Sequence, residues 1–149
     1  MDAGDFTLET DDGGEIFVYR WWPEGEPRAV VQIAHGMAEH AARYAPLAAA
    51  LAAAGYGVVA NDHRGHGRSA KSDDDLGYFA ERDGWNLCVG DLFALNRRLA
   101  AEHPQLPRIL LGHSMGSFMA QHYFIEHGHS ITAGVLSGSN WGGGVMLRL

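Results

Sequence analysis

The chain has 149 residues, of which 46% are hydrophobic and 19% charged, a composition that excludes a disordered segment and suits one modest globular unit. Its net charge of −7 argues against nucleic acid or an anionic membrane surface as an obligate partner. The only cysteine is Cys88, the first residues are acidic rather than signal-like, and no apolar run approaches the ~20 residues of a membrane span. We therefore expect a cytoplasmic protein without a transmembrane segment.

Strand-like and helix-like segments alternate along the chain after an initial hairpin. The turn Asp11-Asp12-Gly13-Gly14 separates two short strands and has the chemistry of an antiparallel hairpin. Pro46 is tolerated in the first turn of a helix that Gly55 ends. The elements expected in chain order are strands over 6–10, 15–22, 29–34 and 57–60, a helix from about Cys88 to His103, a strand over 109–111, a helix from Met115 and a strand over 133–136.

This alternation predicts an α/β fold, with a mostly parallel sheet, helices on both faces and an N-terminal antiparallel hairpin. The loops that follow the apolar strands then gather at the carboxyl edge of the sheet, where ligands bind in such folds. They carry His35-Gly36-Met37, the run from Asp62 to Ser69, and residues 112–116.

The segment Gly112-His113-Ser114-Met115-Gly116 has the pattern Gly-x-Ser-x-Gly after an apolar strand. This pattern is typical of the nucleophile elbow, a tight turn from strand to helix that exposes a serine oxygen. A Cβ at Gly112 or Gly116 would collide with a neighbouring strand or helix. The expected nucleophile is Ser114. The backbone N–H of Met115, together with that of Met37 on the earlier loop, is the expected oxyanion hole.

Three motifs together resemble the monoacylglycerol lipase and lysophospholipase group of α/β-hydrolases, which belongs to the serine aminopeptidase S33 type. They are His35-Gly36-Met37-Ala38-Glu39-His40-Ala41-Ala42-Arg43-Tyr44, Asp62-His63-Arg64-Gly65-His66-Gly67-Arg68-Ser69 and the segment around Ser114. The resemblance implies the α/β-hydrolase fold and a cofactor-free serine hydrolase of lipophilic esters. Ser117 stands where many relatives have a second glycine.

The acid and base of a serine hydrolase triad have no candidates near Ser114. In this fold the order along the chain is Ser, then Asp or Glu, then His, but Glu126 is the only carboxylate after Ser114. At 1.5 Å per helical residue, Glu126 should lie about 18 Å away. The only histidines after Ser114 are His122, His127 and His129. We expect residues 1–149 to be the N-terminal part of a single hydrolase domain, truncated after about the sixth strand and inactive alone, with triad acid, triad base and lid absent.

Histidines near the expected site have a simpler interpretation than catalysis. His35 and His113 belong to the oxyanion loop and the elbow, and we expect each imidazole to satisfy local polar groups. Asp62, His63 and His66 could in principle bind a metal, but a tight glycine turn explains them better, so no metal is expected. Cys88 is expected to be buried, and Glu39 to pair with Arg43 four residues later.

Two classes of function remain open from the sequence. The favoured one is a serine carboxylic-ester hydrolase acting on monoacylglycerol or lysophospholipid-like lipids, with a thioesterase, acyltransferase or aminopeptidase as alternatives within enzymes. The other is a non-catalytic half-domain that binds a partner or a lipid, or has no function. The strand over 133–136 would be an uncovered edge, which favours self-association.

Overall fold

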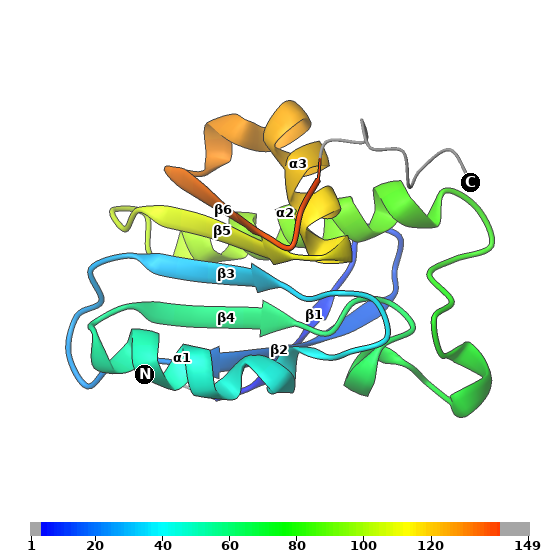
Figure 1. Ribbon diagram of the computed structural model, residues 1–149, viewed down its shortest axis with the longest axis horizontal. Helices are drawn as coiled ribbons and strands as arrows, with labels where there is room; N and C mark the ends of the chain where they lie inside the picture. Colours follow the sequence, from blue (N-terminus) through cyan, green and yellow to red (C-terminus); the bar gives the residue numbers. More distant parts are fainter. Residues whose placement is uncertain (1–3, 141–149) are drawn as a thin grey trace.

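The computed structural model describes residues 4–140, which form one six-stranded sheet in the order β1-β2-β4-β3-β5-β6 (Figure 1). The pairs β1–β2 and β2–β4 are antiparallel, whereas β4–β3, β3–β5 and β5–β6 are parallel. The strands are β1 (Phe6–Glu9), β2 (Glu15–Trp21), β3 (Val30–Ala34), β4 (Gly57–Asn61), β5 (Arg108–His113) and β6 (Ala133–Ser137). The α-helices are α1 (Ala45–Ala53), α2 (Gly84–Glu102) and α3 (Met115–His127).

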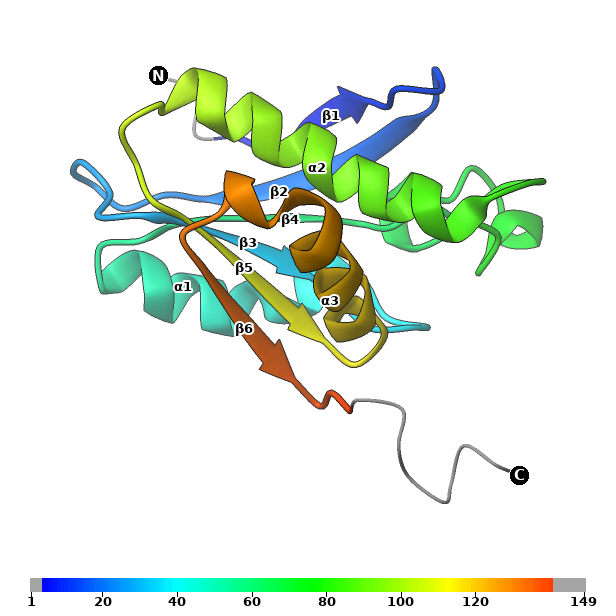
Figure 2. The ribbon, with the colours of Figure 1, turned by 90° about the horizontal axis from the view of Figure 1, so that it is seen from above.

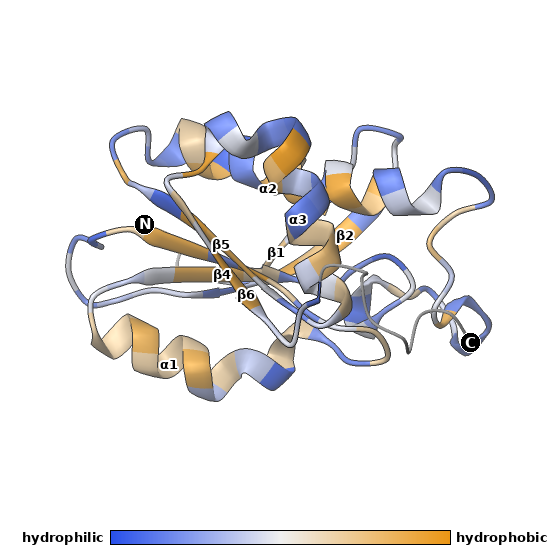
Figure 3. Cartoon of the chain, turned by 45° about the horizontal axis from the view of Figure 1, so that its top comes forward, coloured by the Kyte–Doolittle hydropathy of each residue, from blue (hydrophilic) through white to orange (hydrophobic). Residues whose placement is uncertain are grey.

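The helices cover both faces of the sheet. Figure 2 shows α1 on one face and α2 with α3 on the other. The central strands β3 and β4 are buried at every position, because helices pack on both of their sides. Figure 3 shows orange, apolar segments along the strands of the sheet. The predicted α/β class, the parallel sheet and the N-terminal hairpin are all confirmed.

Helix α2 begins earlier than its apolar spacing predicted. The periodic pattern starts at Cys88, but the helix starts at Gly84, directly after Asp83 in the left-handed region at φ 55°. Trp85 and Asn86 in its first turn are exposed. This turn therefore buries no apolar face, and the periodicity of apolar residues could not predict it. From Cys88 onward the buried side chains repeat at helical spacing. Those from Cys88 to Leu92 pack against α3, whereas Leu95 and Leu99 pack against strands of the sheet.

Strand β6 is one of the two edge strands of the sheet formed by residues 4–140, and β1 is the other. All five of its residues are exposed, including Val135 and Leu136, and the strand contains no charge and no proline. Charged side chains and prolines are the usual protection of a sheet edge against pairing with another chain. The described part of β6 therefore presents an unprotected row of backbone donors and acceptors. Separately, no helix within residues 4–140 combines the length and apolar character needed to cross a membrane.

Candidate active site

Ser114 occupies the corner between β5 and α3. Its backbone has φ 53° and ψ −119°, a strained conformation for a residue with a side chain. Hydrogen bonds hold this corner on both sides. The Ser114 N–H donates to the Ser137 carbonyl at 2.9 Å, and the Ser114 carbonyl accepts the Ser117 hydroxyl at 2.6 Å. Ser117, which stands where many relatives have glycine, thus stabilises the turn through this hydrogen bond and is itself buried.

The two elbow glycines sit where no side chain fits. A Cβ on Gly112 would lie 2.3 Å from the Gly116 carbonyl oxygen, in the first turn of α3. A Cβ on Gly116 would lie 2.1 Å from the Ala34 carbonyl oxygen, at the end of β3. Both obstacles are backbone atoms, so neither can rotate away. The elbow is therefore packed directly on β3, which brings Ser114 next to the loop that follows β3.

The loop after β3 places Gly36, the residue before Met37, next to Ser114. The Cβ position of Gly36 is 3.3 Å from the Ser114 Cβ, so Gly36 also leaves space beside the serine. Met37 is 71% exposed. The N–H of Met37 makes no hydrogen bond to any residue in 4–140, and the N–H of Met115, as the first of a helix, has no partner within it. These are the two N–H groups that the sequence predicted as an oxyanion hole, and that role stays a prediction.

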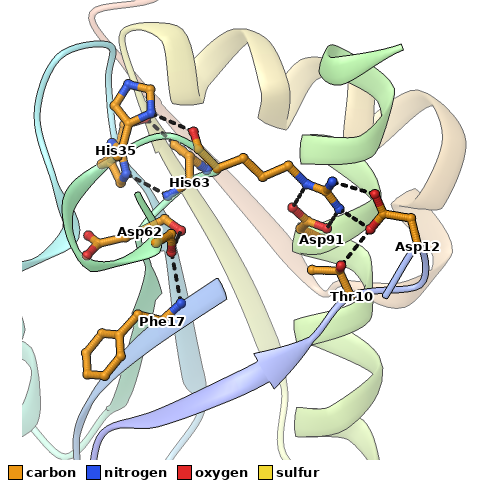
Figure 4. Close-up of polar contacts among 10 residues, drawn as sticks. Thr10, Asp12, Phe17, His35, Asp62, His63 and Asp91 are labelled. Atoms are coloured by element: carbon orange, nitrogen blue, oxygen red, sulfur yellow. Dashed lines mark hydrogen bonds and ion pairs between the residues drawn. The ribbon is translucent and has the colours of Figure 1, made fainter. Parts of the chain in front are cut away.

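A buried pair of histidines lies under this loop. The rings of His35 and His63 are 4.0 Å apart between centroids, and both side chains are fully buried. His35 Nε2 accepts the His63 backbone N–H at 3.0 Å, and His63 Nε2 lies 3.0 Å from the His35 carbonyl oxygen (Figure 4). Burial lowers the pKa of His35 to about 4 and holds the pKa of His63 well below its usual value. Both rings are therefore neutral at pH 7.

This pair makes stability dependent on pH. In the unfolded chain His35 is protonated below about pH 6.5, whereas in the folded protein it stays neutral down to about pH 4. Protonation therefore favours the unfolded state, and the free energy of unfolding falls as the pH drops from 6.5 to 4. The shift from 6.5 to about 4 corresponds to a loss of about 3 kcal/mol by pH 4, and His63 adds to it in the same direction. Urea unfolding at pH 7.5, 6 and 5 measures this loss. A His35→Gln variant should show a shallower decline, and equal stability at pH 7.5 and 5 would contradict the assignment.

Glu39 joins three residues of the segment that follows β3 through its carboxylate. Its side chain is 7% exposed and its carboxylate accepts the Gly36 N–H, the Tyr44 hydroxyl at 2.6 Å and the Arg43 guanidinium. Burial alone would raise the pKa of Glu39, but these hydrogen bonds outweigh it and the net pKa is lowered. The pair with Arg43 is as predicted from the spacing. The contacts with Gly36 and Tyr44 have no signature in the sequence and were missed.

Asp62 and His66 organise the loop that follows β4. The Asp62 carboxylate accepts the backbone N–H groups of Ala41 and Arg68, each at 2.7 Å. His66 Nδ1 lies 2.9 Å from the Arg64 carbonyl oxygen, and its Nε2 accepts the Ala38 N–H at 3.3 Å. These atoms are thus engaged with backbone groups. Within residues 4–140, no three His, Cys, Asp or Glu side chains are grouped as metal ligands.

Arg64 joins this loop to two other elements. It donates to both oxygens of Asp91 on α2, at 2.7 and 2.8 Å, and to both oxygens of Asp12 in the β1–β2 turn (Figure 4). These bonds lower the pKa of Asp12. Burial raises the pKa of Asp91, and Arg64 opposes that rise. Asp91 is a buried carboxylate inside an apolar helical pattern, so a partner was required, but the sequence did not identify Arg64 as that partner.

The remaining acidic and histidine candidates lie away from Ser114. Helix α3 starts at the carboxyl ends of the parallel strands, and β6 starts again at their amino ends. The C-terminal end of α3 therefore lies at the opposite end of the strands from Ser114. There Glu126 pairs with His122 at 3.0 Å, and the His127 ring stacks on Phe93 at 3.9 Å between centroids. His113 remains beside the elbow, with its Nδ1 3.1 Å from the Ser137 hydroxyl. Among residues 4–140, His122 and His127 thus have partners in Glu126 and Phe93, and the expectation that the triad base is absent stays a prediction.

The fold and the corner at Ser114 define an α/β-hydrolase. The sequence profile of the family described as serine aminopeptidase, S33, matches residues 25–147, and the chain belongs to that family. In structure it is similar to a thermostable carboxyl esterase from Bacillus coagulans, with a TM-score of 0.87 and 29% identity over 94% of this chain and 45% of that one.

Curated relatives carry lipase names. A monoacylglycerol lipase of Mycolicibacterium smegmatis is 45% identical over 127 residues, which is 85% of this chain and 43% of the relative. The human monoglyceride lipase is 36% identical over 76% of this chain and 35% of its own length. The chain thus spans less than half the length of these relatives. The resemblance to the monoacylglycerol lipase group is confirmed.

Proposed function

We propose that Ser114 is the nucleophile of a serine hydrolase that cleaves carboxylic esters through an acyl-enzyme. The observation that carries this proposal is the geometry at the elbow. Ser114 is held at φ 53° on the N-terminus of α3, with the unpartnered N–H of Met37 on the adjacent loop and that of Met115 beside it. Attack of the Ser114 oxygen on the ester carbonyl forms a tetrahedral oxyanion, which these two N–H groups stabilise. Loss of the alcohol leaves the acyl-enzyme, and water then releases the acid.

The reaction also needs a base, because a serine hydroxyl is a weak nucleophile without one. The contacts of Glu126 with His122 and of His127 with Phe93 support a base from elsewhere, because these side chains already have partners on α3 and α2. We propose that the base and its carboxylate partner come from a segment outside this chain, and that residues 1–149 form one part of the hydrolase domain. Without them the residual rate rests on the oxyanion hole and binding alone.

For the substrate we propose monoacylglycerols or lysophospholipid-like esters. The support is the identity with relatives named monoacylglycerol lipase and the apolar Met37 side chain exposed next to Ser114. We place the reaction in the cytoplasm, which suits the single, buried and unpaired cysteine, Cys88. A thioesterase, an acyltransferase or an aminopeptidase would use the same acyl-enzyme chemistry, and a non-catalytic half-domain remains the alternative outside enzymes.

A substrate comparison tests this function. With the protein isolated from its source cells, we expect hydrolysis of a long-chain monoacylglycerol to exceed that of an aminoacyl amide by at least about 100-fold. Ser114→Ala should remove activity by about a millionfold, because the nucleophile is lost. His129→Ala, on the exposed far edge, is the matched control and should retain it. Preference for the amide would favour an aminopeptidase, and no activity on either substrate would favour the non-catalytic half-domain.

We also propose that residues 1–149 alone self-associate through the edge of β6. The exposed Val135 and Leu136 and the lack of charge on this strand favour pairing with the same edge of a second copy. Light scattering of the isolated chain should then show dimers or larger species. Val135→Lys, which puts a charge on this edge, should shift the chain toward monomer. Ile125→Lys, on an exposed helical position, is the control that should not. A monodisperse monomer before any substitution would contradict this proposal.

A further inference from the structure

Three consecutive peptide groups in the loop after β3 are each held by one side chain. Glu39 accepts the Gly36 N–H, a His35 ring nitrogen bonds to the Gly36 carbonyl, and His66 accepts the Ala38 N–H. Of the three successive N–H groups from Gly36 to Ala38, only that of Met37 has no acceptor among residues 4–140. The loop therefore leaves one donor free between two that are tied down.

The proton on His35 is assigned by its contacts. His35 Nε2 lies 3.0 Å from the backbone nitrogen of His63, which can only donate. Nε2 must therefore be an acceptor, and the hydrogen of the neutral ring is on Nδ1. Nδ1–H then donates to the Gly36 carbonyl at 2.7 Å. The lowered pKa of His35, about 4, keeps this tautomer neutral at pH 7.

This bond fixes the direction of the Met37 N–H. The peptide between Gly36 and Met37 is trans and planar, so its carbonyl and its N–H point in opposite directions. The carbonyl is drawn inward to His35, which is fully buried. The N–H must point outward, on the side where the Met37 side chain is exposed. A reversed peptide would place a carbonyl oxygen where the developing oxyanion needs a donor.

We propose that His35 is a positioning residue, which locks the Gly36–Met37 peptide so that the Met37 N–H faces the reaction at Ser114 before substrate binds. This inference rests on the proposed function. Its physical basis is that a donor fixed in advance needs no reorganisation when charge develops in the transition state. His35 itself touches neither the substrate nor the reacting atoms.

Two substitutions at His35 separate this role from simple packing. In His35→Asn the side-chain amide can place a donor near the position of Nδ1 and so keep the bond to the Gly36 carbonyl. In His35→Gln the amide reaches the position of Nε2, which keeps an acceptor for the His63 N–H but leaves the Gly36 carbonyl without its partner. A residue that only fills space would give the reverse order, because glutamine is closer to histidine in volume.

The first measurement is nuclear magnetic resonance of the full 149-residue chain. Long-range proton–nitrogen spectra should show His35 with its hydrogen on Nδ1, and dipolar couplings should show one orientation of the Met37 N–H. That orientation should persist in His35→Asn and change in His35→Gln. A hydrogen on Nε2, or an unchanged Met37 N–H in His35→Gln, would overturn the proposal. If His35→Gln fails to fold, the tautomer in the unsubstituted chain and the His35→Asn orientation decide the matter.

The second measurement is binding of n-butylboronic acid, which forms a tetrahedral adduct with a serine oxygen and mimics the oxyanion. Boron resonance should give an affinity that falls about 100-fold in His35→Gln and changes only a few-fold in His35→Asn. Equal affinities in both variants would overturn the proposal. This binding is measured on the protein isolated from its source cells, because the proposed base lies outside residues 1–149. If that protein forms no adduct at Ser114, the proposed nucleophile fails, and the orientation of the Met37 N–H still decides the role of His35.

Discussion

Replacing Gly116 by alanine should destabilise the fold by about 3 kcal/mol, the largest effect expected from adding one methyl group here. The new Cβ would lie 2.1 Å from the Ala34 carbonyl oxygen and 2.5 Å from that of His35. Both are backbone atoms at the end of β3, so relief requires α3 to move away from the sheet. That movement would also displace Ser114 from Gly36. Urea unfolding followed by tryptophan fluorescence measures the loss.

Gly90→Ala is the matched control for this substitution. Gly90 lies in the middle of α2, and a Cβ there would meet nothing within 4 Å. Alanine is preferred over glycine inside a helix by about 1 kcal/mol, so this variant should be as stable as the original chain or more stable. A Gly116→Ala chain with unchanged stability would show that α3 does not pack on β3 as closely as described.

Replacing Arg64 by methionine should cost about 3 kcal/mol. Asp91 is buried on α2, and Arg64 makes two hydrogen bonds to its carboxylate. Methionine keeps the apolar stem but leaves that carboxylate without its partner. The loss should shrink as the pH falls toward 4, because a protonated Asp91 no longer needs a cation. The same substitution frees the β1–β2 turn, which Arg64 holds through Asp12.

The control is Arg97→Met, which removes a pair with Asp11 in the same turn. Both partners there are more than half exposed, so the expected loss is about 1 kcal/mol or less. Adding Asp91→Asn to Arg64→Met should recover part of the stability, because the buried charge is gone. If Arg64→Met and Arg97→Met lose the same amount at pH 7, the pairing of Arg64 with Asp91 adds no stability.

Much of this fold could be predicted from local pattern alone. The runs that end at Ala34 and Ala60 are apolar without alternation, and both became fully buried central strands. The hairpin turn at residues 11–14 likewise formed where its glycines and aspartates indicated. The start of α2 was placed four residues late because Trp85 and its neighbours face solvent. Helical periodicity reports only the turns that bury a face.

The candidate site was harder to predict from the sequence, because the hydrogen bonds that hold its loops join segments far apart along the chain. Motif spacing predicted the roles of Ser114, Met37 and Met115, which stay predictions, and it predicted that the histidines contact local polar groups, as His35 and His66 do. It could not show that Glu39 reaches the Gly36 N–H, or that Arg64 reaches Asp91. Those pairings depend on loop geometry, and any of several charged residues nearby has the right charge to be a partner. The tautomer of His35 follows only from the atoms around it.

The most direct test of the account is labelling by a fluorophosphonate, which reacts with activated serine nucleophiles. In extracts of the source cells, mass spectrometry should find the label on the peptide that contains Ser114. The isolated 149-residue chain should react far more slowly, because we propose that the base lies outside it. Recovery of that peptide without label, while other serine hydrolases in the extract are labelled, would contradict the assignment of Ser114 as a nucleophile. Rapid labelling of the isolated chain would contradict the need for an external base.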